Sequence, residues 1–127
     1  MPGICLLVAG VVVASIPADE FTLAWQHSVE KTRWEERYRV AGASLTLVEA
    51  SVEGMGAGME PPEGARLVQG RWSWKPRVAP LPELRLARSA FAHDYDVCWR
   101  GHCRTLAALT GSPSTAVVTV RVCGANR

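Results

Sequence analysis

The chain has 127 residues, enough for one domain with its own hydrophobic core, and we expect residues 1–127 to form a single β-rich domain. Its 14 basic and 12 acidic residues nearly balance, and the basic residues do not form the positive stripe that binding to a phosphate backbone requires. We therefore expect no nucleic-acid partner. Eleven glycines and eight prolines separate runs rich in valine, leucine, threonine and tryptophan, a composition typical of strands joined by turns.

The first apolar segment, from Ile4 to Ile16, suits a secretory signal, a membrane anchor or buried strands. No Lys or Arg precedes Lys31, so the charged start of a signal peptide is missing, and the segment is shorter than the roughly 20 residues that span a bilayer. Gly10 divides it, which favours two strands, 4–9 and 11–16, folded back on each other and covered on both faces. Without a convincing signal peptide or transmembrane helix, the expected location is cytoplasmic by default, with a periplasmic or membrane-associated location as the alternatives.

Further strands are predicted where β-rich runs alternate with turn residues. They cover 20–29, 33–40, 44–53, 66–75 with a turn at Gly70, 83–89, 94–99, 103–109 and 115–122. The total is about ten short strands, and no stretch has a convincing 3.6-residue period, so few or no helices are expected. The predicted fold class is all-β, as an antiparallel β-sandwich or a closed barrel.

The alternation in residues 20–40 places two ionisable side chains on apolar faces. His27 shares a face with Phe21, Leu23 and Trp25, and Glu36 shares a face of the next strand with Trp34 and Tyr38. A buried carboxylate needs a cation or a hydrogen-bond donor nearby. We expect that partner among three residues: His27, Lys31 and Arg85.

Two loops are candidate binding segments. Polar residues cluster after His27, at the end of a predicted strand, where binding groups often lie, although an ordinary hairpin loop is polar as well. Glycines alternate from Gly54 to Gly58, but Pro61 and Pro62 disfavour the helix that a phosphate-binding glycine loop would open. The segment is either a plain loop or a site lining without side chains. Trp72 and Trp74 share a strand face and suit an apolar binding surface.

The four cysteines suggest one disulfide. If Arg100 and Gly101 form a two-residue hairpin turn, Cys98 and Cys103 face each other at a rung close enough for a disulfide bond, which would favour an oxidising compartment. Cys5 and Cys123 lie in apolar runs and are most simply buried thiols, unless the terminal strands are neighbours. Only one close pair of candidate ligands is present, so we expect no metal site.

The chain also resembles a small bacterial family, domain of unknown function 1850, from Cys5 to about Leu106. The segments that carry the resemblance are FTLAWQHSVEKTRWEERYRV, GMGAGMEPPEGA, PELRLARS and YDVCWRGHCRTL. The strongest motifs run from His27 to Tyr38 and from Gly54 to Pro62, and Gln26 stands where threonine is expected. The resemblance implies a gene neighbourhood beside TAXI-type tripartite ATP-independent periplasmic (TRAP) transporters. It further implies one ligand-binding surface made of His27, Ser28, Glu30, Lys31, Trp34, Glu35, Glu36, Gly54, Gly56, Gly58, Met59 and Glu60.

We therefore expect a non-catalytic accessory or binding module of a TRAP transport system. Its expected partner is a membrane or solute-binding subunit of the transporter, or a small anionic solute, and no cofactor is expected. Two alternatives remain open: a small hydrolase or isomerase in which His27 and Glu36 act as base and orienter, and a purely structural assembly factor.

Overall fold

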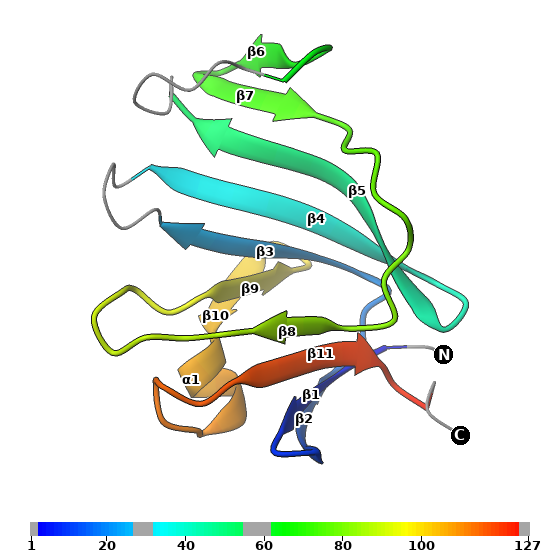
Figure 1. Cartoon of the computed structure of the whole chain (residues 1–127), viewed down its shortest axis with the longest axis vertical. Coiled ribbons are helices and arrows are strands. Elements are labelled where there is room, and N and C mark those ends of the chain that lie inside the picture. The colour runs from blue at the N-terminus through cyan, green and yellow to red at the C-terminus, as the bar shows by residue number, and fades with distance from the viewer. Residues whose placement is uncertain (1–2, 27–31, 55–61, 125–127) are drawn as a thin grey trace.

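The computed structural model describes residues 3–26, 32–54 and 62–124, which form two antiparallel sheets packed as an open sandwich (Figure 1). The prediction of an all-β sandwich is confirmed, and the alternative of a closed barrel is not what forms. The elements are β1 (Ile4–Val8), β2 (Val11–Ile16), β3 (Glu20–Gln26), β4 (Arg33–Ala41), β5 (Ser44–Glu53), β6 (Arg66–Val68), β7 (Arg71–Trp74), β8 (Leu84–Leu86), β9 (Asp96–Trp99), β10 (His102–Thr105), α1 (Leu106–Thr110) and β11 (Val118–Val122).

The smaller sheet has the strand order β2-β1-β11-β8 and contains both ends of the described chain. The apolar N-terminal segment is thus a hairpin of two strands, as predicted. Cys5 on β1 is joined to Cys123 just after β11, so these cysteines form a terminal disulfide and are not buried thiols. The expectation that both strands are covered on both faces is wrong, because β2 is an edge strand with Val11, Val12 and Val13 exposed. No helix in the described residues is long and apolar enough to cross a membrane.

The larger sheet has the order β10-β9-β3-β4-β5-β7-β6, and its two faces differ in character. Alternate residues of β4 form ion pairs on the face away from the smaller sheet: Arg33 with Glu35 and Asp96, and Arg37 with Glu20. The other face is apolar, because each strand turns its remaining residues toward the core. β5 has a bulge opposite Arg37 and Tyr38. Because of this bulge, the core-facing residues of β5 stay opposite the core-facing residues of β4 along the whole hairpin.

The core lies between the smaller sheet and only one part of the larger one. Ile4, Leu6 and Val120 of the smaller sheet belong to one buried cluster with Phe21 and Tyr38 of the larger sheet. The strands β6 and β7 and the end of β5 extend beyond the smaller sheet (Figure 1). Part of the apolar face of the larger sheet is therefore not covered by the other sheet.

The hairpin formed by β9 and β10 confirms the predicted turn. Arg100 and Gly101 both have positive φ, at 51° and 84°, as a two-residue turn with the twist of the flanking strands requires. Cys98 and Cys103 face each other with Cα atoms 4.0 Å apart and form the hairpin disulfide. Among the described residues no cysteine is free.

One predicted strand is partly a helix. The strand expected at 103–109 ends at Thr105, and residues 106–110 form the short helix α1. Thr105 caps it by accepting a hydrogen bond from the Ala108 N–H, and Gly111, with φ at 65°, ends it in the left-handed conformation. A five-residue helix is too short to give a visible 3.6-residue period, which explains the error. The strands expected at 83–89 and 115–122 are shorter than predicted, spanning β8 and β11.

Candidate functional site

Four aromatic rings form a continuous row on the apolar face of the larger sheet. Trp25 on β3 stacks on Trp34 of β4 with ring centroids 6.4 Å apart, and Trp34 meets the edge of Trp74 on β7 at 6.4 Å. Tyr95, directly before β9, lies 5.9 Å from Trp25. All four side chains are only partly buried. We call Tyr95, Trp25, Trp34 and Trp74 the aromatic row; the alternation of three strands places them there.

The row contains an unsatisfied hydrogen-bond donor. The indole Nε1 of Trp34 is buried and has no hydrogen-bond partner in the described part of the chain. A buried N–H without an acceptor costs about 1–3 kcal/mol relative to a paired one, so such donors are rare in folded proteins. The centre of the row therefore has the capacity to donate a hydrogen bond to an acceptor that the described residues do not supply.

Glu36 lies on the same face, next to the row, and is half-buried. Its carboxylate Oε1 accepts a hydrogen bond from the Tyr38 hydroxyl at 2.8 Å. Burial, together with the neighbouring Glu36 charge, raises the pKa of Tyr38 well above its usual range. A donor beside Glu36 was predicted, but Arg85, one of the three candidates named, is not that donor; Tyr38 from the same strand is.

The structure separates some of the predicted site residues. Trp34 and Glu36 share the apolar face, whereas Glu35 points to the opposite face and pairs with Arg33 at 3.0 Å. Glu35 therefore does not share one surface with its two neighbours, because successive residues of a strand face opposite sides. Gly54 follows β5 in a turn, with its N–H donated to the carbonyl of Gly70 at 2.8 Å.

The remaining predicted residues lie outside the described ranges. They are His27, Ser28, Glu30, Lys31, Gly56, Gly58, Met59 and Glu60. The described strands that flank them give partial information: β3 ends at Gln26, β4 begins at Arg33 opposite it, and β5 ends at Glu53. Glu36 lies opposite Leu23, three rungs inside the Gln26–Arg33 pair, so the described strands do not bring it to the end from which the His27 segment starts.

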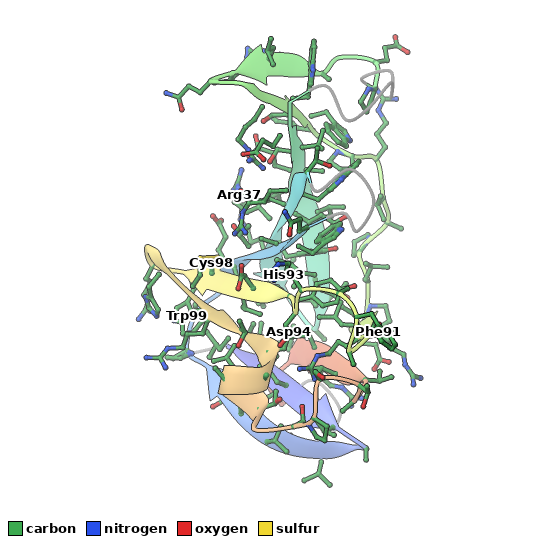
Figure 2. The ribbon with its side chains drawn as sticks, turned by 90° about the vertical axis from the view of Figure 1, so that its left-hand side faces the viewer. Arg37, Phe91, His93, Asp94, Cys98 and Trp99 are labelled. Carbon is green, nitrogen blue, oxygen red and sulfur yellow. A yellow bond between two sulfur atoms is a disulfide. The ribbon has the colours of Figure 1, made fainter. Side chains whose placement is uncertain are left out.

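A cavity opens at one end of the aromatic row. It measures about 370 Å³, and its walls include Trp25, Tyr95, Ala87, Ala92 and His93. Figure 2 looks onto this end of the sheet and shows His93 in the loop between β8 and β9. Four polar residues, Gln26, Arg88, Ser89 and His93, also line it, so the cavity is mixed in character, with more apolar than polar surface. Apolar cavities with a few polar groups are the usual form of small-molecule and side-chain binding sites.

A groove lies at the other end of the row. It measures about 640 Å³ and is lined by Trp74, Lys75, Pro76 and Arg77 on one side and by Pro62, Glu63 and Gly64 on the other. Lys75 and Arg77 are exposed, and neither has an ion-pair partner among the described residues. By contrast, Arg33, Arg37 and Arg71 on the opposite face of the sheet are all ion-paired. The groove thus combines an aromatic wall with two cations and one carboxylate, Glu63, and its formal charge is +1.

Sequence analysis pointed to the faces of Trp25 and Trp74 but missed Tyr95, Lys75 and Arg77. A signal for Tyr95 was available, because it precedes buried Val97 by two residues and so shares its face. Lys75 and Arg77 flank a proline just after Trp74, but the sequence does not show that they line a groove together with Pro62 and Glu63. No group of three or more His, Cys, Asp or Glu side chains suited to a metal ion occurs among the described residues.

Comparison with known proteins identifies a family but no characterised relative. No curated protein and no solved structure matches the chain. One family model matches residues 21–106, that is 86 of 127 residues, a range that contains the aromatic row, the cavity and the groove. The chain therefore belongs to the family described as Domain of unknown function (DUF1850).

Proposed function

We propose that the protein is a non-catalytic accessory module of a TAXI-type TRAP transport system and that it binds a small organic anion on the aromatic row. The observation that carries this proposal is the row itself: partly exposed rings, of which Trp34 and Trp74 lie outside the core cluster while Trp25 and Tyr95 pack against it. Aromatic side chains placed this way offer contact area at a small entropic cost, because few torsions must be fixed on binding.

The charge of the groove favours an anion over a cation or a neutral ligand. A carboxylate next to Lys75 and Arg77 would gain two charge-assisted contacts, because neither cation is ion-paired with a described residue, although Glu63 lines the same groove. The apolar part of the same molecule would lie against Trp74 and extend toward Trp34, whose buried N–H has no acceptor among the described residues. The proposed ligand class is therefore a carboxylate with an apolar or aromatic body.

The geometry gives less support to catalysis. Glu36, the proposed orienter of a hydrolase or isomerase, accepts a hydrogen bond from Tyr38 and lies three rungs inside the strand ends. A general base and its orienting group must lie within hydrogen-bond distance of each other. Apart from Tyr38, no titratable side chain among the described residues is hydrogen-bonded to Glu36. Binding is therefore the function that the described surface supports best.

Calorimetric titration of the full chain with a panel of aliphatic and aromatic mono- and dicarboxylates tests the proposal. The double substitution Lys75→Ala with Arg77→Ala should weaken binding about tenfold, since exposed ion pairs contribute up to about 1 kcal/mol each. The matched control is Arg85→Ala with Arg104→Ala, which removes the same charge from exposed arginines outside the groove and should leave affinity unchanged.

The second arm of the test concerns the transport partner. Purified TRAP subunits encoded in the same genome are presented to the wild-type chain and to Trp74→Ala in surface-binding measurements. Binding that depends on Trp74 identifies a subunit as the occupant of the row in place of a solute. If neither any carboxylate nor any subunit binds the wild-type chain, the proposal is wrong.

A further inference from the structure

The loop between β8 and β9 presents one fully exposed aromatic side chain. Phe91 is 99% exposed, more than any other large apolar residue in the described chain. In Figure 2 it lies at the outer rim of the molecule, whereas Asp94 of the same loop lies in the interior near α1. Single exposed apolar residues are common, but a phenyl ring with its whole surface in solvent contributes nothing to the core and has that surface available for a partner.

The loop that carries Phe91 is firmly anchored. Arg88 has a side chain only 1% exposed and forms a bidentate pair with Asp94, with Nε–Oδ1 and Nη2–Oδ2 distances of 2.9 and 3.0 Å. Its Nη1 donates to Ser112 Oγ and to the carbonyl oxygens of Pro113 and Ala116 at 3.1–3.2 Å. Asp94 Oδ2 also accepts from the N–H of Ala107 at 2.7 Å. Three donor contacts from the buried guanidinium thus tie the loop to the segment before β11, and Asp94, held by the other two, ties it to α1.

The tip of the loop is fixed as well. The Phe91 N–H donates to Ser89 Oγ at 3.1 Å, and the Ala92 N–H donates to the Ser89 carbonyl at 3.4 Å, which closes a turn around Phe91. A side chain on a fixed turn loses little entropy when it is buried by a partner. Phe91 is thus exposed by a rigid support and not by a loose loop.

A cavity of suitable size lies on the same loop. The 370 Å³ cavity at the end of the aromatic row has apolar walls from Ala87, Ala92, Trp25 and Tyr95, and it is also lined by Gln26, Arg88, Ser89 and His93. An apolar cavity of about 150 Å³ already accepts benzene, so this one is large enough for a phenyl ring. Phe91 does not fill it, because its own ring is directed to solvent.

We propose that Phe91 inserts into this cavity on a second copy of the chain, so that the protein forms a reciprocal two-fold dimer. A two-fold interface requires that a projection and its complementary cavity lie side by side on one surface, which is how Phe91 and Ala92 are placed. The partner's Phe91 would then stand beside Trp25 and Tyr95 and lengthen the aromatic row by one ring.

Charge and area are compatible with this partner. The charged residues of the loop, Arg88 and Asp94, neutralise each other, so two copies meet there without like-charge repulsion between these ions. Each phenyl ring buries roughly 150–200 Å² and covers a similar area of the cavity wall, so two contacts bury about 600–800 Å² before neighbouring atoms are counted. This is below the roughly 1,200 Å² of a stable interface, so the dimer should be weak and dependent on concentration.

Sedimentation equilibrium of the full chain from about 5 to about 500 µM tests this inference by mass action. Wild type should shift from monomer to dimer, and Phe91→Ser should raise the dimer dissociation constant about 30-fold or more. Val12→Ser on the exposed edge of β2 is the matched control, because it also removes an exposed apolar side chain and should leave the dissociation constant unchanged.

Two outcomes would overturn the inference: a wild-type chain that stays monomeric over the whole range, and Phe91→Ser dimerising as tightly as wild type. A photo-crosslinking residue in place of Phe91 gives an independent readout. It should attach to Ala92, Trp25 or Tyr95 of the other copy, and attachment confined to β2 would contradict the proposed geometry. Neither measurement depends on the proposed anion, so this inference and the proposed function can fail separately.

Discussion

Substituting Arg88 by Met tests whether the buried ion pair holds the β8–β9 loop in place. The Arg88 side chain is 1% exposed and that of Asp94 15%, so the change leaves a largely buried carboxylate without its cation. Breaking a buried pair on one side costs about 3–5 kcal/mol. Asp94 keeps the N–H donors of Tyr95 and Ala107, so we expect the lower end of that range, about 3 kcal/mol.

Urea unfolding at pH 7 without reductant measures this loss as a lower midpoint with an unchanged slope. The matched control is Arg39→Met, which breaks the exposed Arg39–Glu20 pair on the opposite face, where the side chains are 55% and 41% exposed. Exposed pairs contribute less than about 1 kcal/mol, so the control should remain close to wild type.

The same pair predicts a pH dependence. Burial alone would raise the pKa of Asp94, but hydrogen bonds from Arg88 and the Ala107 N–H and the Arg88 charge together lower it. Stability from the ionised carboxylate is therefore complete above about pH 4, where unfolded aspartate is ionised, and is lost as the pH falls further through the folded-state pKa. The difference between wild type and Arg88→Met should be constant from pH 7 to about pH 5 and should shrink below about pH 4. A cost no larger than that of Arg39→Met would refute this account of the loop.

Three other predictions concern the core and the cross-links. Alkaline spectrophotometric titration of the folded chain should show no phenolate near pH 10, since burial raises the pKa of Tyr38 and Tyr95, and phenolate at pH 10 would contradict this. The free energy of unfolding should fall as the pH rises above about 10, because tyrosine then ionises in the unfolded chain but not in the folded one. Replacing both cysteines of the terminal disulfide by serine should cost about 4–5 kcal/mol in urea unfolding, against about 2 for the hairpin disulfide, because it closes the longer loop. Gly101→Ala should cost about 1–2 kcal/mol in the same assay, because φ is 84° there, and an unchanged midpoint would refute the strained turn.

Much of the fold follows from local pattern. The β4–β5 hairpin, predicted at 33–40 and 44–53, forms at Arg33–Ala41 and Ser44–Glu53, because long alternating runs separated by Gly42 leave little freedom of register. The hairpin disulfide was also predictable, because a two-residue turn fixes which residues face each other. The terminal disulfide was not, because pairing of the first and last strands is a property of the whole sheet.

The candidate site was predictable only in part. Alternation correctly placed Trp34 and Glu36 on the apolar face, but the grouping of Glu35 with them ignored the same alternation. The row joins residues from four segments, and which of them become neighbours depends on the strand order β9-β3-β4-β5-β7, which no local pattern encodes. The anchoring of Phe91 likewise depends on Arg88 reaching residues 24 to 28 positions away in the chain.

The aromatic row as a binding surface is tested most directly by NMR of the five tryptophan indole N–H signals during titration with benzoate and with aliphatic dicarboxylates. The account predicts saturable shifts of the Trp34 and Trp74 signals, with the Trp34 proton moving toward that of a hydrogen-bonded indole. Trp99, which packs against His102 in the β9–β10 hairpin 4.4 Å away, is the internal control and should not move. No saturable shift at Trp34 and Trp74, or an equal shift at Trp99, would contradict the account.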